Sequence, residues 1–336
     1  MVFWHKTNGL EQFTPTFIQD TEMKIIFMGT PEFAVASLDI LVKNNYNIVA
    51  VITAPDKPAG RGNELHQSDV KKYALANNLP ILQPTNLKSP DFLEELKKLN
   101  ADLQIVVAFR MLPEIVWSMP PKGTFNLHAS LLPKFRGAAP INWAIINGET
   151  QTGVTTFFLQ QEIDTGNIIL QQKEPIYKTD NVGDLYARLM KIGAELTLKT
   201  VQKIEKNDIQ PQIQTGMPTH APKIFRETCQ IDWDKTSKEI YNFVRGLSPY
   251  PAAWTTIKGK NCKIYATEII DDLEEISENN INNSNKNIAI GEFFIAENNK
   301  NIYFKTKDSF LKIKELQLEG KKRLLVEEFL RGFKAP

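Results

Sequence analysis

Short hydrophobic runs alternate with segments of helical periodicity over the first two thirds of the chain. Residues 24–28 and residues 48–53 are runs typical of buried strands, and the apolar positions between them recur every three to four residues, as on one face of a helix. A strand, a helix and a second strand in this order form a crossover between parallel strands. The pattern therefore predicts an α/β domain with a doubly wound, mostly parallel sheet.

The same alternation continues to residue 206, and turn-forming residues then interrupt it. Further strands are expected at 81–82, 103–109, 125–128, 154–158 and 168–171. Further helices are expected at 68–78, 91–99, 138–147 and 182–205. Residues 207–228 contain four Gly or Pro residues and little apolar periodicity. We therefore expect a first domain over 23–206 and a linker over 207–228.

After this linker the pattern changes to short strands. One helix is expected at 236–246, followed by strands at 253–257, 263–269, 288–296, 301–306 and 310–316. Short strands between Gly- and Asn-rich turns predict an OB-like β-barrel domain over residues 229–336. Residues 1–22 lack the apolar core of an export signal, and since Met23 falls directly before the first strand we expect them to be an N-terminal extension or an alternative start.

The composition limits the compartment and the kind of partner. With 336 residues the chain is long enough for two domains that each bury a core. No apolar run approaches the 18 or so residues of a membrane span, so no membrane partner is expected. Cys229 and Cys262 are far apart in sequence, which supports neither a disulfide framework nor a zinc site and fits a cytoplasmic protein.

Charge is balanced over the whole chain but not locally. The formal net charge is +1, so a nucleic-acid-binding surface would have to be a local one. Residues 300–323 hold eight Lys and Arg against three Asp and Glu. This segment is either a face that contacts phosphates or an ordinary solvated surface rich in lysine.

The candidate chemistry is concentrated in residues 124–166. Asn126 and His128 lie two positions apart at the end of an expected strand, so their side chains share a face at the edge where open α/β sheets bind ligands. The turn 130–133 follows directly, and Asp164 follows a later strand. An amide, an imidazole and a carboxylate can polarise a carbonyl and manage its protons, which points to acyl-type transfer. Taken singly, His128 is more typical of a structural histidine and Asp164 of a turn cap.

Two motifs exclude other enzyme classes. Gly29-Thr30-Pro31 stands where a dinucleotide-binding motif would be but lacks the second and third glycines, which disfavours NAD binding. Asp164-Thr165-Gly166 occurs once, whereas aspartic proteases need two carboxylates that share a proton.

Residues 54–62 contain two Pro and two Gly, which predicts an ordered but irregular loop that carries Lys57 and Arg61.

Residues 23–332 resemble the methionyl-tRNA formyltransferase family. The resemblance is carried by FMGTPEF at 27–33, PAGRG at 58–62, NLHASLLPKFRGAAP at 126–140, DTG at 164–166, IDW at 231–233, PYP at 249–251 and GKKR at 320–323. The motif at 126–140 is also similar to glycinamide ribonucleotide formyltransferase and to formyltetrahydrofolate hydrolase. The loop at 58–62 and the second domain with its basic tail resemble the tRNA enzyme instead.

The resemblance implies a Rossmann-like formyltransferase domain and a reaction. The formyl donor would be 10-formyltetrahydrofolate, and the acceptor the α-amino group of methionine on charged initiator tRNA, for translation initiation. No metal is implied. Asn126 and His128 would polarise the formyl group and stabilise the oxyanion, while Asp164 would orient or charge His128 and help remove the amine proton.

The resemblance also implies two sets of binding residues. The folate contacts would be Ser130, Leu131, Leu132, Pro133, Phe109, Arg110 and Met111. Many relatives have Gly at position 110, so Arg110 either clashes with the pterin or contacts the folate carboxylates. The tRNA contacts would be Lys57, Arg61, Lys321, Lys322 and Arg323, with Arg61 sensing the first base pair of the acceptor stem.

Two other functions stay open at this point. The same formyl group could go to water or to a small amine, or the chain could be an OB-containing nucleic-acid-binding module without activity. The second alternative leaves the set of Asn126, His128 and Asp164 unexplained. We expect a monomer in either case.

Overall fold

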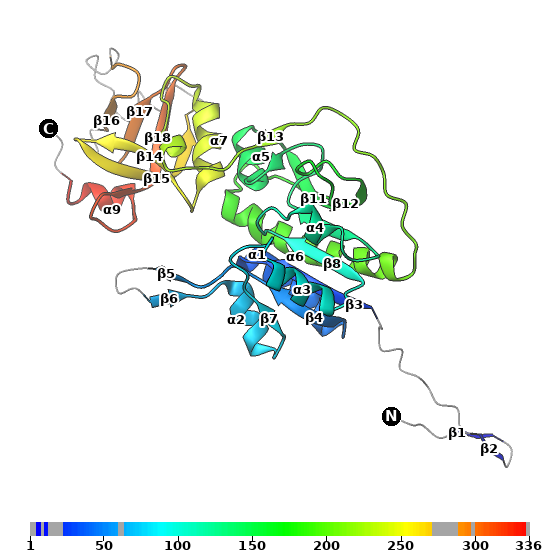
Figure 1. Ribbon diagram of the computed structural model, residues 1–336. Coiled ribbons are helices and arrows are strands. Elements are labelled where there is room, and N and C mark those ends of the chain that lie inside the picture. The colour runs from blue at the N-terminus through cyan, green and yellow to red at the C-terminus, as the bar shows by residue number, and fades with distance from the viewer. Residues whose placement is uncertain are drawn as a thin grey trace. The chain divides into compact units, whose positions relative to one another are not determined.

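The computed structural model describes residues 5–7, 10–12, 23–59, 64–270, 288–296 and 300–333 (Figure 1). Its chain divides into two compact units. The first unit comprises Met1–Leu127 and Thr197–Gln210, and the second comprises His128–Leu196 and Pro211–Pro336. Each unit is described by itself below.

The first unit is built on parallel strands in the order β9-β8-β3-β4-β7. Their bounds are β3 Lys24–Gly29, β4 Asn47–Ile52, β7 Ile81–Leu82, β8 Leu103–Val107 and β9 Thr124–His128. All five residues of β8 are buried, as are all but the first of β3, which explains why both strands are continuous apolar runs. The expected parallel sheet is confirmed.

Short helices connect these strands. Their bounds are α1 Glu32–Lys43, α2 Asp69–Ala76, α3 Pro90–Lys98 and α4 Glu114–Trp117. The hydroxyl of Ser68 caps α2 by accepting a bond from the backbone N–H of Lys71 at 3.0 Å. Pro90 occupies the first turn of α3, where its missing N–H costs no helical bond. Helix α4 is a single turn that periodicity could not predict.

The segment expected to be an irregular loop is in part a hairpin. Strand β5 (Lys57–Ala59) pairs with β6 (Glu64–His66), and Pro58 lies opposite Leu65. A two-stranded ribbon accepts proline because each strand has a free edge that needs no N–H donor. The prediction of an irregular loop was therefore wrong for residues 57–59, which form a strand. Arg61 lies outside the described residues. A second hairpin joins β1 (His5–Thr7) to β2 (Leu10–Gln12).

The second unit begins with α/β elements. They are β10 Arg136–Gly137, α5 Pro140–Ile146, β11 Gln151–Phe158, β12 Ile168–Pro175, the helix α6 Val182–Glu205 and β13 His220–Ala221. Strands β11 and β12 are antiparallel, and β13 runs parallel to β10. The pairing of β13 shows that the segment expected as a linker includes a strand.

The second unit continues as an antiparallel sheet in the order β14-β15-β18-β17-β16 (Figure 1). Strand β19 pairs with β18. The elements are the 3₁₀ turn Glu227–Cys229, α7 Ser237–Leu247, β14 Ala253–Ile257, β15 Lys260–Ile269, β16 Phe293–Ile295, β17 Ile302–Lys305, β18 Phe310–Leu318, β19 Leu324–Leu325 and α9 Val326–Leu330. Helix α7 packs on β15 over a shared core in which Trp233 stacks on Phe304 with ring centroids 4.2 Å apart. All five expected strands are present.

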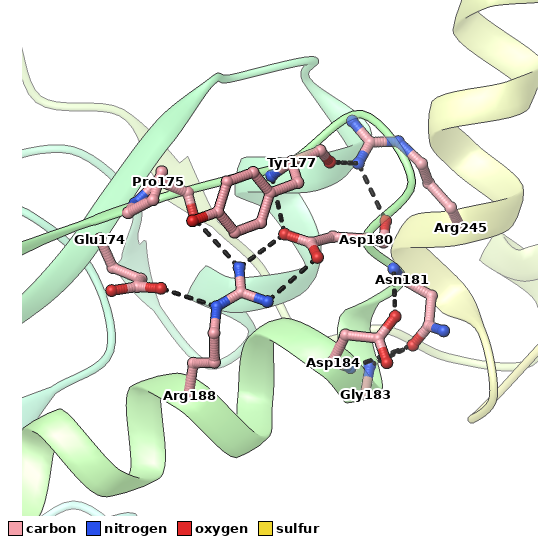
Figure 2. Close-up of polar contacts among 9 residues, drawn as sticks. All are labelled: Glu174, Pro175, Tyr177, Asp180, Asn181, Gly183, Asp184, Arg188 and Arg245. Carbon is pink, nitrogen blue, oxygen red and sulfur yellow. Dashed lines mark hydrogen bonds and ion pairs between the residues drawn. The ribbon is translucent and has the colours of Figure 1, made fainter.

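A polar network within the second unit joins the turn after β12 to α6 and α7 (Figure 2). Arg188 of α6 donates to both carboxylate oxygens of Asp180, at 3.0 and 2.6 Å, and to Glu174 at 2.6 Å. The backbone N–H of Tyr177 also donates to Asp180, at 2.7 Å. Arg245 of α7 donates to the backbone carbonyls of Asp180 and Tyr177. Burial raises the pKa of Asp180, but the hydrogen bonds from Arg188 and Tyr177 outweigh it and the net pKa is lowered.

Candidate active site

His128 stands at the carboxyl end of β9 with its imidazole buried. Its Nε2 lies 2.8 Å from the carbonyl oxygen of Phe135. Because a carbonyl oxygen can only accept, Nε2 must carry a proton, and Nδ1 is the nitrogen that can exchange one. The ring of Phe157 meets the imidazole edge-on, with centroids 6.5 Å apart, and fixes its plane.

Asp164 faces the exchangeable nitrogen. Its Oδ2 lies 3.8 Å from Nδ1 of His128, within reach of an ion pair once the imidazole is protonated. The backbone N–H of Gly137 donates to the same Oδ2 at 2.8 Å and fixes the carboxylate. Asp164 itself has φ +55°, a left-handed conformation that Asp tolerates better than most residues. The structure therefore brings His128 and Asp164 together.

The turn that carries Asp164 depends on Gly166. A Cβ atom at this position would lie 1.6 Å from the carbonyl oxygen of Phe158. The hydroxyl of Thr165 donates to the carbonyl of Glu162 at 3.0 Å and closes the other side of the turn. The Asp-Thr-Gly sequence is thus a packed backbone feature that delivers a carboxylate, which accounts for its residue types.

The turn that begins at Ser130 is held from inside the protein. The hydroxyl of Thr155 donates to the carbonyl of Ser130 at 2.6 Å and accepts from the N–H of Leu132 at 3.2 Å. The amide of Gln171 donates to the carbonyl of Leu132 at 2.9 Å. The buried hydroxyl of Ser130 is used in the turn itself, donating to the carbonyl of Lys134 at 2.6 Å. The side chain of Ser130 therefore supports the shape of the turn.

Asn126 lies on the same strand as His128. It is half-buried and stands opposite Val106 in the register of β8 and β9. Side chains alternate along a strand, so residues two apart project from the same face. The strand thus carries the amide and the imidazole on one face.

Both parts of the chain match known formyl transferases. The formyl transferase family profile matches residues 23–201, and the profile of the formyl transferase C-terminal domain matches residues 223–334. The methionyl-tRNA formyltransferases of Bacteroides thetaiotaomicron and Flavobacterium johnsoniae are 51% and 52% identical to this chain over 318 residues, which cover 93% of this chain and 96% of each relative. This chain belongs to the methionyl-tRNA formyltransferase family.

A solved structure supports the fold of this member of the methionyl-tRNA formyltransferase family. The structure of WlaRD, described as a sugar 3N-formyl transferase in the presence of dTDP and 5-N-formyl-THF, is 26% identical with a TM-score of 0.63. The similarity covers 89% of this chain and 99% of that chain. The formyltransferase fold is therefore shared along nearly the whole length.

Arg110 lies in the first unit. Its guanidinium donates to the backbone carbonyls of Pro84 and Thr85, the latter at 2.9 Å, and lies 5.7 Å from the ring centroid of Phe109. Burial lowers its pKa. Met111 beside it is 75% exposed. Arg110 is thus held by backbone carbonyls, and Met111 leaves an apolar side chain open to a ligand.

The expected tRNA-contacting residues differ in their exposure and in whether an acidic side chain pairs with them. Lys57, Lys321 and Lys322 are exposed. Arg323 instead forms a two-pronged pair with Glu315, at 2.6 and 2.6 Å. This hydrogen-bonded pairing raises the pKa of Arg323 and neutralises its charge locally. Arg323 is therefore the weakest candidate of the set for a phosphate contact.

Several residues that hold this site carry no sequence signal. Phe135 and Gly137 act through their backbones, and Thr155 and Gln171 act on the backbone of another turn. Backbone contacts leave no mark on residue type, so only the three-dimensional structure reveals them. Among the described residues, no helix is long and apolar enough to cross a bilayer, and no three His, Cys, Asp or Glu side chains are grouped so that they could hold a metal.

Proposed function

We propose that this protein transfers the formyl group of 10-formyltetrahydrofolate to the α-amino group of methionine on charged initiator tRNA, giving N-formylmethionyl-tRNA. The observation that carries the proposal is identity of 51% and 52% with proteins named methionyl-tRNA formyltransferase, over 93% of the chain. The match includes the C-terminal domain, residues 223–334. Similarity in the formyl-transfer domain alone would not indicate which amine accepts the formyl group.

We propose that three side chains carry the chemistry. When bound, 10-formyltetrahydrofolate supplies the formyl carbon, and tetrahydrofolate leaves with a proton on N10. Asn126 donates its amide N–H to the formyl oxygen as the amine attacks the carbon. His128, protonated at Nδ1, stabilises the same developing oxyanion, and its proton on Nε2 stays with Phe135. Asp164 stabilises the imidazolium and takes the amine proton through water, for return to N10 of the leaving group.

We propose two groups of folate contacts. A cavity of about 370 Å³ in the first unit is lined by Arg110, Met111, Lys88 and Asn86 among others. Its mixture of apolar and cationic groups fits a flat ring system with a carboxylate tail. The turn from Ser130 to Pro133, with Leu131 and Leu132, and the side chain of Phe109 complete the proposed set. We also propose cytoplasmic location and a monomer.

The tRNA contacts are proposed at Lys57, Arg61, Lys321, Lys322 and Arg323. Arg61 offers a sharp test of base readout against phosphate contact. If Arg61 only contacts phosphate, Arg61→Ala weakens the binding of initiator tRNA and of elongator tRNA by the same factor. If it reads the end of the acceptor stem, the variant changes the ratio of kcat/KM between the two tRNAs.

The proposed function is tested by one assay with several acceptors. Purified protein is incubated with 10-formyltetrahydrofolate and methionyl initiator tRNA, methionyl elongator tRNA or a dTDP-linked amino sugar, and products are separated by mass spectrometry. Formylmethionyl initiator tRNA is the expected product. Free formate without formylmethionine would identify a hydrolase, a formylated sugar would identify a sugar enzyme, and no product at all would leave a binding module.

A further inference from the structure

Gln214 lies in the segment between α6 and β13 and has all four hydrogen-bonding sites of its amide occupied. Its Nε2 donates to the backbone carbonyls of Asp164 at 2.8 Å and Gly166 at 2.9 Å. Its Oε1 accepts from Nε and Nη2 of Arg136, at 3.2 and 2.6 Å. A side-chain amide has two donor hydrogens and two acceptor positions, so none is left for water.

These contacts close a ring around the Asp164 carboxylate. The backbone N–H of Gly137, next to Arg136 in the chain, donates to Oδ2 of Asp164 at 2.8 Å. Gln214 holds the backbone of Asp164 on one side and Arg136 on the other. The left-handed φ of +55° at Asp164 requires such support, because a sparsely populated conformation persists only where its surroundings fix it.

The same ring reaches His128. Phe135, whose carbonyl accepts from Nε2 of His128, precedes Arg136 directly. The N–H of Phe135 donates in turn to the hydroxyl of Thr219, in the same segment as Gln214, at 2.8 Å. The segment therefore holds the backbone partner of the imidazole as well as the carboxylate that faces it.

A neighbouring glutamine supplies a natural contrast. Gln212 pairs with Ile168 through its backbone only, at 2.8 Å in each direction, and is exposed. Ile213 between the two glutamines is 77% exposed. The attachment of this stretch to the Asp164 turn by a side chain is thus made at Gln214.

We propose that Gln214 is a positioning residue for formyl transfer, which sets the placement of the Asp164 carboxylate against Nδ1 of His128. This inference rests on the catalytic roles proposed above for His128 and Asp164. The segment from 214 to 221 is then a functional part of the active site, although its composition is that of a linker.

Two substitutions separate the bonds that Gln214 makes. Gln214→Met keeps the length of the side chain and removes all four bonds. Gln214→Glu keeps the pairing with Arg136 but loses both donated bonds and sets an oxygen against the carbonyls of Asp164 and Gly166. We expect both variants to lower kcat by about 10- to 100-fold, with KM for both substrates within about twofold, because misplacement of a catalytic group costs on this scale. Gln212→Met is the matched control and should keep its kcat.

A spectroscopic measurement separates positioning from general loss of structure. The amide ¹H and ¹⁵N chemical shifts of Gly137, measured at one pH, report its hydrogen bond to Oδ2 of Asp164. We expect these shifts to move in both Gln214 variants and to stay in Gln212→Met. Thermal unfolding of each variant gives the folded fraction used to normalise kcat.

Three results would overturn the inference. The first is a normalised kcat within twofold of the parent in both Gln214 variants, and the second is a lowered kcat accompanied by unchanged amide shifts of Gly137. Either of these, combined with an inactive His128→Ala, contradicts the positioning role alone. The third is full activity of His128→Ala, which contradicts the proposed catalytic role and removes the basis of the inference with it.

Discussion

At the scale of single residues, the polar atoms of His128 and Asp164 are held by partners within the protein. His128 has one nitrogen committed to a backbone carbonyl and the other facing Asp164. Such commitment holds catalytic groups in place at no entropic cost during the reaction, which is how electrostatic preorganisation lowers a barrier. Replacing a committed group should therefore affect turnover far more than binding.

His128→Ala tests this directly, and Asn126→Ala tests the amide proposed to act on the same oxyanion. Each removes a donor that acts on the developing oxyanion, and kcat should fall by about 100- to 1,000-fold. Binding of tRNA, measured by fluorescence titration with labelled methionyl-tRNA, should stay within about threefold of the parent. Near-normal turnover in either variant would contradict the assigned role.

Gly166→Ala tests the packing of the Asp164 turn. The added Cβ would stand 1.6 Å from the carbonyl oxygen of Phe158, so the backbone must shift. We expect a loss of about 1–3 kcal/mol in the free energy of unfolding, as for overpacked sites, measured by urea denaturation. Gly332→Ala is the control, since its Cβ would meet nothing within 4 Å. Equal stability of the two variants would argue against a packed turn.

The sequence could identify Asn126, His128 and Asp164 as candidates because amide, imidazole and carboxylate groups have recognisable chemistry. It could not identify Phe135 or Gln214. Phe135 acts through a carbonyl that every residue possesses, and the role of Gln214 depends on a fold that brings residues 164 and 214 together. Their contribution exists only in the folded chain.

At the scale of elements, strands were predicted better than their connections. Strands β3 and β8 are buried on both faces, so their runs of apolar residues are unmistakable. The hairpin of β5 and β6 was missed because two Pro and two Gly mask its alternation. The single-turn helix α4 and the short strand β19 are below the length at which periodicity can be detected.

The Asp180 network allows a prediction at this scale that depends on pH. The lowered pKa of Asp180 means that its ionised form stabilises the folded state above the unfolded pKa, near 4, and that this contribution is lost as pH falls through the folded pKa. Asp180→Asn removes the charge that pairs with Arg188, while Arg188 keeps Glu174 and the carbonyl of Pro175, so we expect a cost of about 1–3 kcal/mol at pH 7.

The difference in the free energy of unfolding between Asp180→Asn and the parent, from urea denaturation, should shrink as pH falls below about 4, where the unfolded parent begins to protonate, and its ionic part should be gone below the lowered folded pKa. Asp184→Asn is the control, because an exposed side chain that keeps its acceptor oxygen for the N–H of Asn181 should change little at either pH. A gap between parent and Asp180→Asn that is the same at pH 7 and pH 3 would contradict the ionic origin of the effect.

At the scale of the whole molecule, net charge says little about a nucleic-acid partner. The chain carries a formal charge of +1, and two lysines of the basic segment share one acidic partner: Lys314 lies 3.0 Å and Lys312 3.5 Å from Glu268. The number of these charges could be read from the sequence, but their pairing could not.

The domain boundaries near residues 206 and 229 stay a prediction.

The double variant Lys321→Gln, Lys322→Gln tests the basic tail of the second unit. Each phosphate contact contributes about 0.7–0.9 to the slope of log K against log salt. We therefore expect the slope for tRNA binding to fall by about 1.5, with kcat unchanged at saturating tRNA. Arg323→Gln should change the slope less, because Glu315 already neutralises Arg323. An unchanged slope in the double variant would exclude these lysines from the interface.

The pairing of β13 with β10 limits how the chain can vary in length. Gln214, Thr219 and Ala221 each meet a fixed partner, and Gly137, with φ +125°, approaches the backbone of Ala221 so closely that a Cβ would lie 2.6 Å from its carbonyl oxygen. An inserted or deleted residue between 214 and 221 would shift Gln214, Thr219 and Ala221 relative to one another, so they could not all reach their partners. This stretch is therefore a poor place for circular permutation, domain fusion or proteolytic excision of the catalytic half.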